Sequence, residues 1–75
     1  MTWIKTEDKL PKEGQRVIYY FKWVGVHRGE FTKFKIGPLP ELDCFYGEYG
    51  WLCSDVTHWM PDEGQELPEA PEDDG

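Results

Sequence analysis

The segment from Arg16 to Val24 constrains the fold of this chain more than any other part of the sequence. It reads RVIYYFKWV and consists almost entirely of β-branched and aromatic residues, which are typical of β-strands. Successive side chains of a strand point to opposite faces. One face then carries Val17, Tyr19, Phe21 and Trp23, and the other carries Ile18, Tyr20, Lys22 and Val24. Because neither face is cleanly polar, we predict a central strand that is covered on both sides.

The remaining strands are predicted from shorter patterns. Val26 to Ile36 predicts a strand with a bulge or a sharp bend at Gly29. Asp55 to Met60 predicts a last strand, which Pro61 ends. Between them, the two glycines of Phe45-Tyr46-Gly47-Glu48-Tyr49-Gly50-Trp51-Leu52 predict a hairpin.

One helical turn is expected near the N-terminus. Thr6-Glu7-Asp8-Lys9 begins with a residue that favours the N-cap position, and the residue before Pro11 avoids the α region. Together these patterns predict a mainly β fold over residues 1–61. We expect a compact antiparallel sheet of four to five strands, barrel-like or sandwich-like, with this short helical turn. A chain of 75 residues has room for one such domain.

The two cysteines flank the predicted hairpin. In its simplest register Cys44 lies opposite Cys53, and Tyr46 lies opposite Trp51. Opposed residues of a ladder have Cα atoms about 4.5–5.5 Å apart, which is within reach of a disulfide. No apolar run is long enough to span a membrane and no secretory signal is recognisable, so we expect a cytoplasmic protein with no membrane partner. In a reducing cytoplasm we expect two buried thiols, with a disulfide as the alternative.

Charge is divided unevenly along the chain. All eight Lys and Arg residues lie within residues 1–36, whereas residues 37–75 contain eleven acids, and the net charge is −7. Residues 62–75 form an acidic, proline-containing segment that we predict to be a disordered tail. Its acids are Asp62, Glu63, Glu66, Glu69, Glu72, Asp73 and Asp74. As an alternative to disorder, the start of this segment lies against the body in polyproline geometry, with Leu67 and Pro68 as anchors. The acidic tail has two functional interpretations: a solubilising extension or, together with Glu41, Asp43, Glu48 and Asp55, an anionic interaction surface that imitates DNA phosphates.

The aromatic residues, 16% of the chain, also have two interpretations. They form the core of a small β protein, or some of them line a face that stacks a base or a partner side chain. Basic residues near the same strand would suit phosphate, although the net charge makes direct binding to nucleic acid unlikely. The candidate binding residues are Tyr19, Phe21, Trp23, Arg28, Trp51, His58 and Trp59.

No catalytic or metal-binding motif is recognisable. His58 lacks the H-x-H or H-E-x-x-H spacing of a metal site, and we expect it to be a hydrogen-bonded structural residue. No serine lies in a nucleophile elbow, and no glycine-rich loop is present to bind phosphate. We therefore expect no enzyme activity, no cofactor and no metal.

Two segments at opposite ends of the chain resemble a known family. The opening Trp3-Ile4, Leu10-Pro11, Gly14-Gln15 and Val17, and the closing Val56-Thr57-His58-Trp59-Met60-Pro61, are the most specific parts of a resemblance to a family of small phage and prophage proteins catalogued as domain of unknown function 551. The resemblance covers nearly the whole chain and includes Tyr19, Phe45-Tyr46, Gly50-Trp51 and Leu67-Pro68. The resemblance implies an accessory role for a phage in the cytoplasm of its bacterial host. It supplies no catalytic residues.

The function expected first is that of a non-enzymatic accessory protein that binds a host macromolecule, a host protein most of all, as an inhibitor of a host enzyme or defence system. The alternative is a binding protein for a small nucleotide-like ligand, which stacks on an aromatic and basic face, with an oligomer interface as one place for that face. A weak enzyme or a structural phage component ranks third.

Overall fold

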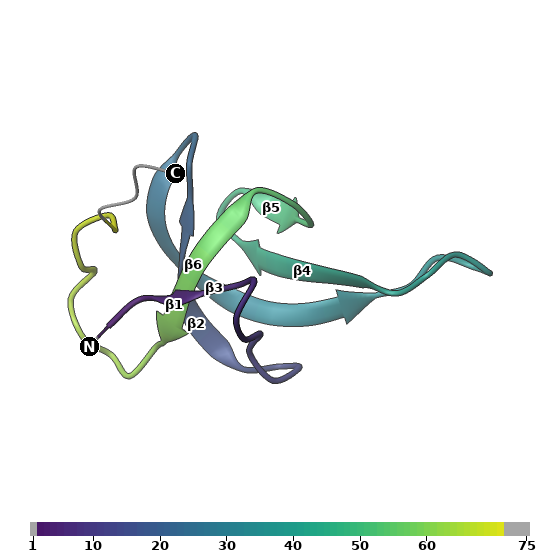
Figure 1. Cartoon of the computed structure of the whole chain (residues 1–75), viewed down its shortest axis with the longest axis horizontal. Coiled ribbons are helices and arrows are strands. Elements are labelled where there is room, and N and C mark those ends of the chain that lie inside the picture. Colours follow the sequence, from purple (N-terminus) through teal and green to yellow (C-terminus); the bar gives the residue numbers. More distant parts are fainter. Residues whose placement is uncertain (1, 72–75) are drawn as a thin grey trace.

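A single antiparallel sheet of six strands forms the molecule (Figure 1). The structure is a computed structural model that describes residues 2–71. The strands are β1 (Ile4–Lys5), β2 (Arg16–Phe21), β3 (Gly25–Phe34), β4 (Leu42–Gly47), β5 (Gly50–Leu52) and β6 (Val56–Pro61). Their order in the sheet is β1-β6-β2-β3-β4-β5. The predicted mainly β, antiparallel fold is confirmed. The structure has one sheet of six strands, whereas four to five strands in a barrel-like or sandwich-like unit were predicted, and the strand that was not predicted is β1, which is two residues long.

The hydrophobic core lies on one side of this curved sheet, which we call the inner face. Side chains from four strands are buried together there: Val17 and Tyr19 from β2, Phe31 from β3, Phe45 from β4, and Val56 and Trp59 from β6. Ile4, Phe21 and Leu52 pack around them. The register of β6 against β2 places Tyr19 opposite Trp59, so aromatic residues distant in sequence meet in the centre of the sheet.

Strand β3 connects the two halves of the sheet. Its first residues pair with β2 and its last residues pair with β4, and Gly29 pairs with both Val17 and Gly47. The pairing is continuous through Gly29, so the expected bulge is absent there. A Cβ at Gly29 would lie 2.4 Å from the Tyr46 carbonyl oxygen and 2.8 Å from Cε1 of Tyr19. Glycine is required here because backbone and ring approach too closely for any side chain.

The strand predicted over residues 16–24 ends earlier than expected. Phe21 pairs with Gly25, and Lys22, Trp23 and Val24 form the loop of a hairpin. Val24 N–H donates to the Phe21 carbonyl, and Gly25 has a φ of +94°, as in a three-residue hairpin loop. Trp23 therefore leaves the strand and lies in the loop, where 69% of its surface is exposed.

The helical turn predicted near Thr6 is a hydrogen-bonded turn, and no helix forms within residues 2–71. The amides of Asp8 and Lys9 both donate to the Lys5 carbonyl. The Thr6 hydroxyl does not cap this turn. It donates to the carbonyl of Val56 at 3.0 Å and so attaches the turn to β6.

The opposite side of the sheet, the outer face, is also buried over β2 and β6. Ile18 and Met60 lie opposite each other there, and both are fully buried. Their cover comes from the segment after β6, which passes alongside the N-terminal residues (Figure 1). Gln65 contacts the Met60 sulfur, and the Trp3 indole N–H donates to the Glu69 carbonyl. The prediction of a strand covered on both sides is thus confirmed for β2.

Arg28 anchors the segment 62–71 to the sheet. Its guanidinium donates to the Asp62 carboxylate at 2.6 Å and to the Gln65 carbonyl. Asp62 N–H donates in turn to the Arg16 carbonyl. The prediction of a disordered tail is therefore wrong for residues 62–69, because charge-assisted and backbone hydrogen bonds hold this part of the chain against the outer face.

The cysteines are joined. Tyr46 pairs with Trp51 and Phe45 with Leu52, as the predicted hairpin register requires, and a disulfide links Cys44 to Cys53. The expectation of two buried thiols is wrong: Cys44 is buried, whereas Cys53 is exposed. The two Cα atoms are 4.1 Å apart across the ladder, and this proximity is the physical reason that the sulfurs can bond.

Candidate functional site

Three aromatic side chains form a strip on the outer face of β3, β4 and β5. The ring centre of Trp51 lies 4.8 Å from that of Tyr46 and 5.1 Å from that of Phe34. Strand alternation puts all three on the side of the sheet away from the core, together with the disulfide. Trp51 is 52% exposed, Tyr46 is 48% exposed and Phe34 is 38% exposed. We call these three residues the aromatic strip.

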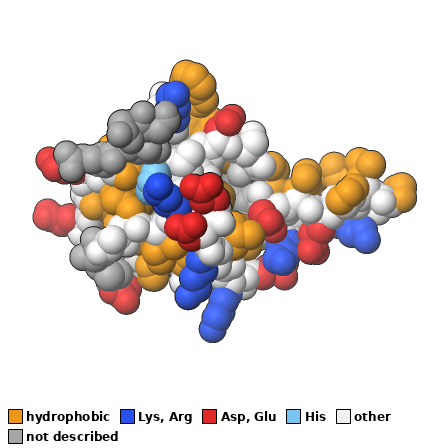
Figure 2. Space-filling view, viewed as in Figure 1, with side chains coloured by type: hydrophobic (Ala, Val, Ile, Leu, Met, Phe, Trp, Pro, Cys, Tyr) orange, Lys and Arg blue, Asp and Glu red, His pale blue; other side chains and the backbone are white. Residues whose placement is uncertain are grey.

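Further apolar side chains continue the aromatic strip toward the end of the molecule. Leu42 pairs with Phe34, and the connection from β3 to β4 adds Ile36 and Leu39, all exposed. Figure 2 shows hydrophobic side chains gathered along this projecting arm. Contiguous exposed apolar surface of this kind marks an interaction site more often than scattered single residues do.

A basic groove lies beside the aromatic strip on the outer face. The sheet register sets Arg16, Glu30, Tyr46 and Trp51 in one row across β2 to β5. A pocket of about 240 Å³ is lined by Arg16, Arg28, Glu30, Tyr46, Gly29 and Gly47. Arg28 is already bound to Asp62, and Glu30 contributes an opposing charge, so Arg16 is the arginine available to a ligand there.

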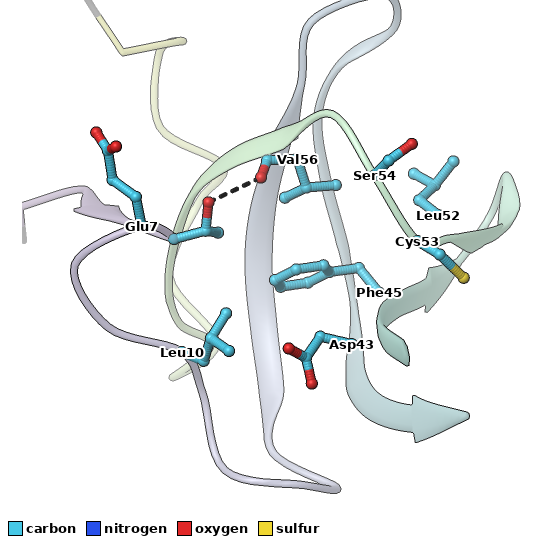
Figure 3. A pocket seen from close by; sticks show the side chains of 9 residues that line it. Glu7, Leu10, Asp43, Phe45, Leu52, Cys53, Ser54 and Val56 are labelled. Carbon is cyan, nitrogen blue, oxygen red and sulfur yellow. Dashed lines mark hydrogen bonds between the residues drawn. The ribbon is translucent and has the colours of Figure 1, made fainter. Parts of the chain in front are cut away.

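A second pocket, of about 290 Å³, opens at the edge of the core beside β5. We call it the β5 pocket. Its apolar lining consists of Leu10, Phe45, Leu52 and Val56. Its polar lining consists of Thr6, Glu7, Asp43, Cys53 and Ser54. In Figure 3 the Asp43 carboxylate lies below the Phe45 ring and turns toward Leu10, whereas Glu7 stands at the outer rim. No Lys or Arg lines this pocket, so its charged groups are both acidic.

The structure does not bring the predicted binding residues onto one surface. Tyr19 and Trp59 are buried in the core, and the Trp59 indole N–H donates to the Lys9 carbonyl at 2.8 Å. Phe21 packs at the edge of the same core. Because these three rings hold the sheet together, the aromatic binding face predicted along residues 19–23 does not form.

The other predicted residues are spread over three places. Trp23 lies in the hairpin loop, Arg28 is bound to Asp62, and Trp51 belongs to the aromatic strip. His58 is buried, with Nδ1 2.8 Å from the Thr57 hydroxyl. Its ring lies edge-on to Trp3 and Tyr20, so its surroundings are those of a structural histidine.

The predicted acidic surface is only partly free. Asp62 is paired with Arg28, and its side chain is largely buried. Glu63, Glu66 and Glu69 are exposed on the segment that covers the outer face. Glu72, Asp73 and Asp74 lie outside the described residues.

The Tyr19 hydroxyl is the one polar side-chain atom in the described part of the chain that is buried without a hydrogen-bond partner. Burial raises the pKa of Tyr19, and the charges of Glu48 and Tyr49 raise it further. The His27 ring lies beside the Tyr19 ring, and the Nε2 atom of His27 is 2.9 Å from the Val24 carbonyl oxygen. The Tyr19 side chain is therefore a protonated phenol in the buried interior, as expected of a structural residue.

Within residues 2–71, no group of three or more His, Cys, Asp or Glu side chains is arranged to hold a metal ion. The described residues also contain no helix that is long and apolar enough to cross a membrane.

The sequence pattern did not predict that Phe34 and Leu42 lie beside Trp51, or that Asp43 and Glu7 line one pocket. Strand alternation, counted from Cys44 to Tyr46 and from Cys53 to Trp51, places Tyr46 and Trp51 on the same face of the sheet as the cysteines. No comparable signal identifies the β5 pocket, because its lining comes from three segments distant in sequence.

Comparison with known proteins gives a family and no named relative. No curated protein and no solved structure matches the chain. A family model described as a protein of unknown function (DUF551) matches residues 2–72, nearly the whole length. The match extends across all six strands and the segment that covers the outer face, and the chain therefore belongs to this family of proteins of unknown function, DUF551.

Proposed function

We propose that this chain is a non-enzymatic, phage-type accessory protein that binds a host protein through its aromatic strip. The observation that carries the proposal is the difference in cover on the outer face. The segment 62–71 buries that face over β2 and β6, whereas no part of residues 2–71 covers the aromatic strip over β3, β4 and β5 in the same way. Exposed aromatic side chains in a contiguous patch are typical of the centre of protein interfaces.

Inhibition of a host enzyme or defence system is the form of binding that we expect. The exposed acids Glu63, Glu66 and Glu69, with the net charge of −7, would steer the protein toward a basic partner. The cytoplasm of the bacterial host is the compartment that we propose for this encounter, and the Cys44–Cys53 disulfide would then have to persist against its reducing thiols.

The test is capture of a partner from a bacterial host lysate by the wild type and by a Trp51→Ala variant. Removing a tryptophan from the centre of an interface costs about 2 kcal/mol or more, so we expect binding to weaken by about 30-fold or more. Trp23→Ala is the matched control, because Trp23 is also exposed but lies in the β2–β3 hairpin loop. A partner that both variants retain equally would rule out the aromatic strip as the binding surface.

A small nucleotide-like ligand is the second candidate. The basic groove supports it, because Arg16 lies two row positions from Tyr46, with Glu30 between them, and could bind phosphate while Tyr46 or Trp51 stacks a base. The volume of about 240 Å³ is below the usual range of about 300–1,000 Å³, which is why this candidate ranks second.

A melting-temperature screen with a nucleotide panel separates the two proposals. A ligand present at about 100 times its Kd would stabilise the fold by about 2.7 kcal/mol, and Arg16→Ala should remove the effect. No shift with any nucleotide would leave protein binding as the function to pursue.

A further inference from the structure

The β5 pocket is small and has room for a single long side chain. Its volume of about 290 Å³ lies at the lower limit of about 300 Å³ for small-molecule sites. Its walls come from the turn after β1, from β4 and from the connection between β5 and β6. Because these segments are fixed by the Thr6–Val56 hydrogen bond and by the disulfide, the pocket is preformed.

The charge of the β5 pocket selects a cation. Asp43 and Glu7 are its only charged lining residues, and neither takes part in an ion pair within the described chain. The nearest cation by register is Lys33, opposite Asp43 on β3, and its ammonium lies 3.9 Å from Glu41. An anion entering the pocket would meet the Asp43 carboxylate, and no Lys or Arg is among the described residues that line the pocket.

The lining of the β5 pocket also favours a side chain that has an apolar stem and a charged head. Leu10 and Phe45 lie on either side of the space into which the Asp43 carboxylate turns (Figure 3). Lysine and arginine combine an apolar stem with a charged head, and they bury the stem while the head stays near water and counter-ions. A stem against Leu10 and Phe45 would bring the head to Asp43, whereas the Glu7 carboxylate lies farther out and points away from Asp43 (Figure 3).

We propose that the β5 pocket receives a lysine or arginine side chain of the bound partner protein. The inference rests on the proposed function and extends it, because it states what the partner must present beside β5. The partner surface would then pair a basic side chain for the β5 pocket with an apolar region for the aromatic strip. Trp51 and Leu52 are adjacent residues of β5 that point to opposite faces, so one partner segment along β5 could reach both sites.

The proposal can be tested without the partner by nuclear magnetic resonance titration. The probes are N-acetyl-arginine amide and N-acetyl-lysine amide, with N-acetyl-norleucine amide as an uncharged stem of similar length. We expect the two cationic probes to shift the backbone amides of Asp43, Leu52 and Ser54 in a saturable manner. Norleucine should bind more weakly, and a salt concentration of about 0.5 M should reduce the difference.

Substitution of the acids identifies the site. Asp43→Asn should weaken binding of the arginine probe about two- to fivefold, as expected for loss of one exposed charge partner, and Glu7→Gln should weaken it further or by a similar factor. Asp8→Asn is the control, because Asp8 lies in the same turn as Glu7 but does not line the pocket. All three acids are exposed, so these variants should fold as the wild type does. Equal binding of norleucine, or unchanged affinity in both Asp43→Asn and Glu7→Gln, would overturn the proposal.

The same variants distinguish failure of this inference from failure of the proposed function. If Trp51→Ala abolishes partner capture and Asp43→Asn leaves it unchanged, the β5 pocket does not contact the partner and the inference alone fails. If no partner depends on Trp51 while the cationic probes still bind in an Asp43-dependent manner, the proposed function fails and the preference of the pocket for a cationic side chain stands.

Discussion

The outer face of the sheet differs between its two halves. Over β2 and β6 it carries Ile18 and Met60, and residues 62–71 with Trp3 cover them. Over β3, β4 and β5 it carries Phe34, Tyr46 and Trp51, which stay exposed. Both halves are apolar, so composition alone does not distinguish a second core from a binding surface. The presence of a covering segment over one half distinguishes the second core from the exposed surface.

The two halves also differ in how they are held together. In the covered half the outer layer is attached by hydrogen bonds of Arg28 and Trp3 to the segment after β6. In the uncovered half a disulfide joins β4 to the residue after β5, on the same face of the sheet as the exposed rings. A covalent link stabilises a region whose apolar surface is covered by no second layer among residues 2–71.

The largest effect is expected at the junction of the halves, Gly29→Ala. The added Cβ would lie 2.4 Å from the Tyr46 carbonyl oxygen, so β4 would have to separate from β3. We expect a loss of more than about 3 kcal/mol, which is a large part of the stability of a chain this size. Chemical denaturation measures it, with Glu30→Ala in the same strand as the control. A Gly29→Ala variant as stable as that control would show that the halves are not joined as described.

The difference in cover between the two halves is tested by substituting one aliphatic residue of the outer face in each half. Ile18→Ala should lower the free energy of unfolding by about 2–5 kcal/mol, because Ile18 is fully buried beneath the covering segment. Leu42→Ala should lower it by less than about 1 kcal/mol, because Leu42 is 44% exposed. Urea unfolding of both variants gives the two values. Similar losses would mean that the two halves are equally covered.

Reduction of the disulfide should affect the uncovered half. The link closes a loop of sequence separation 9, for which chain entropy predicts about 2.5 kcal/mol of stabilisation. We expect unfolding at lower denaturant with a reductant present, and faster hydrogen exchange in β4 and β5 than in β2 and β6. The Cys53→Ser variant, whose exposed position tolerates serine, should not respond to the reductant. A wild type that is equally insensitive would show that the sulfurs are not joined in solution.

The smallest effect concerns Tyr19, whose ring lies against Phe45 and so connects the halves. Burial raises its pKa above 10.0, so the folded state holds the phenolic proton more tightly than the unfolded chain does. The free energy of unfolding should therefore be independent of this group below about pH 10 and fall as the pH rises above that value. Tyr19→Phe should remove this part of the pH dependence with little loss at neutral pH, since the hydroxyl has no hydrogen-bond partner. Identical slopes for both proteins would contradict the raised pKa.

Local patterns predicted much of the sheet because they depend on neighbouring residues. The β-branched and aromatic run places β2, and the glycines between the cysteines place the β4–β5 hairpin in its observed register. The end of β2 was missed because a loop closed by Gly25 competes with the strand propensity of Trp23 and Val24.

By itself, the sequence determined that β2 has two apolar faces, that Cys44 faces Cys53, and that the chain belongs to its family. Only the tertiary structure decided which aromatic residues are core and which are surface, and that residues 62–69 cover half of the outer face. The physical reason is distance along the chain. Alternation assigns a side chain to a face, but the cover of that face comes from contacts such as Arg28 with Asp62 or Trp3 with Glu69, which join residues that no local pattern relates.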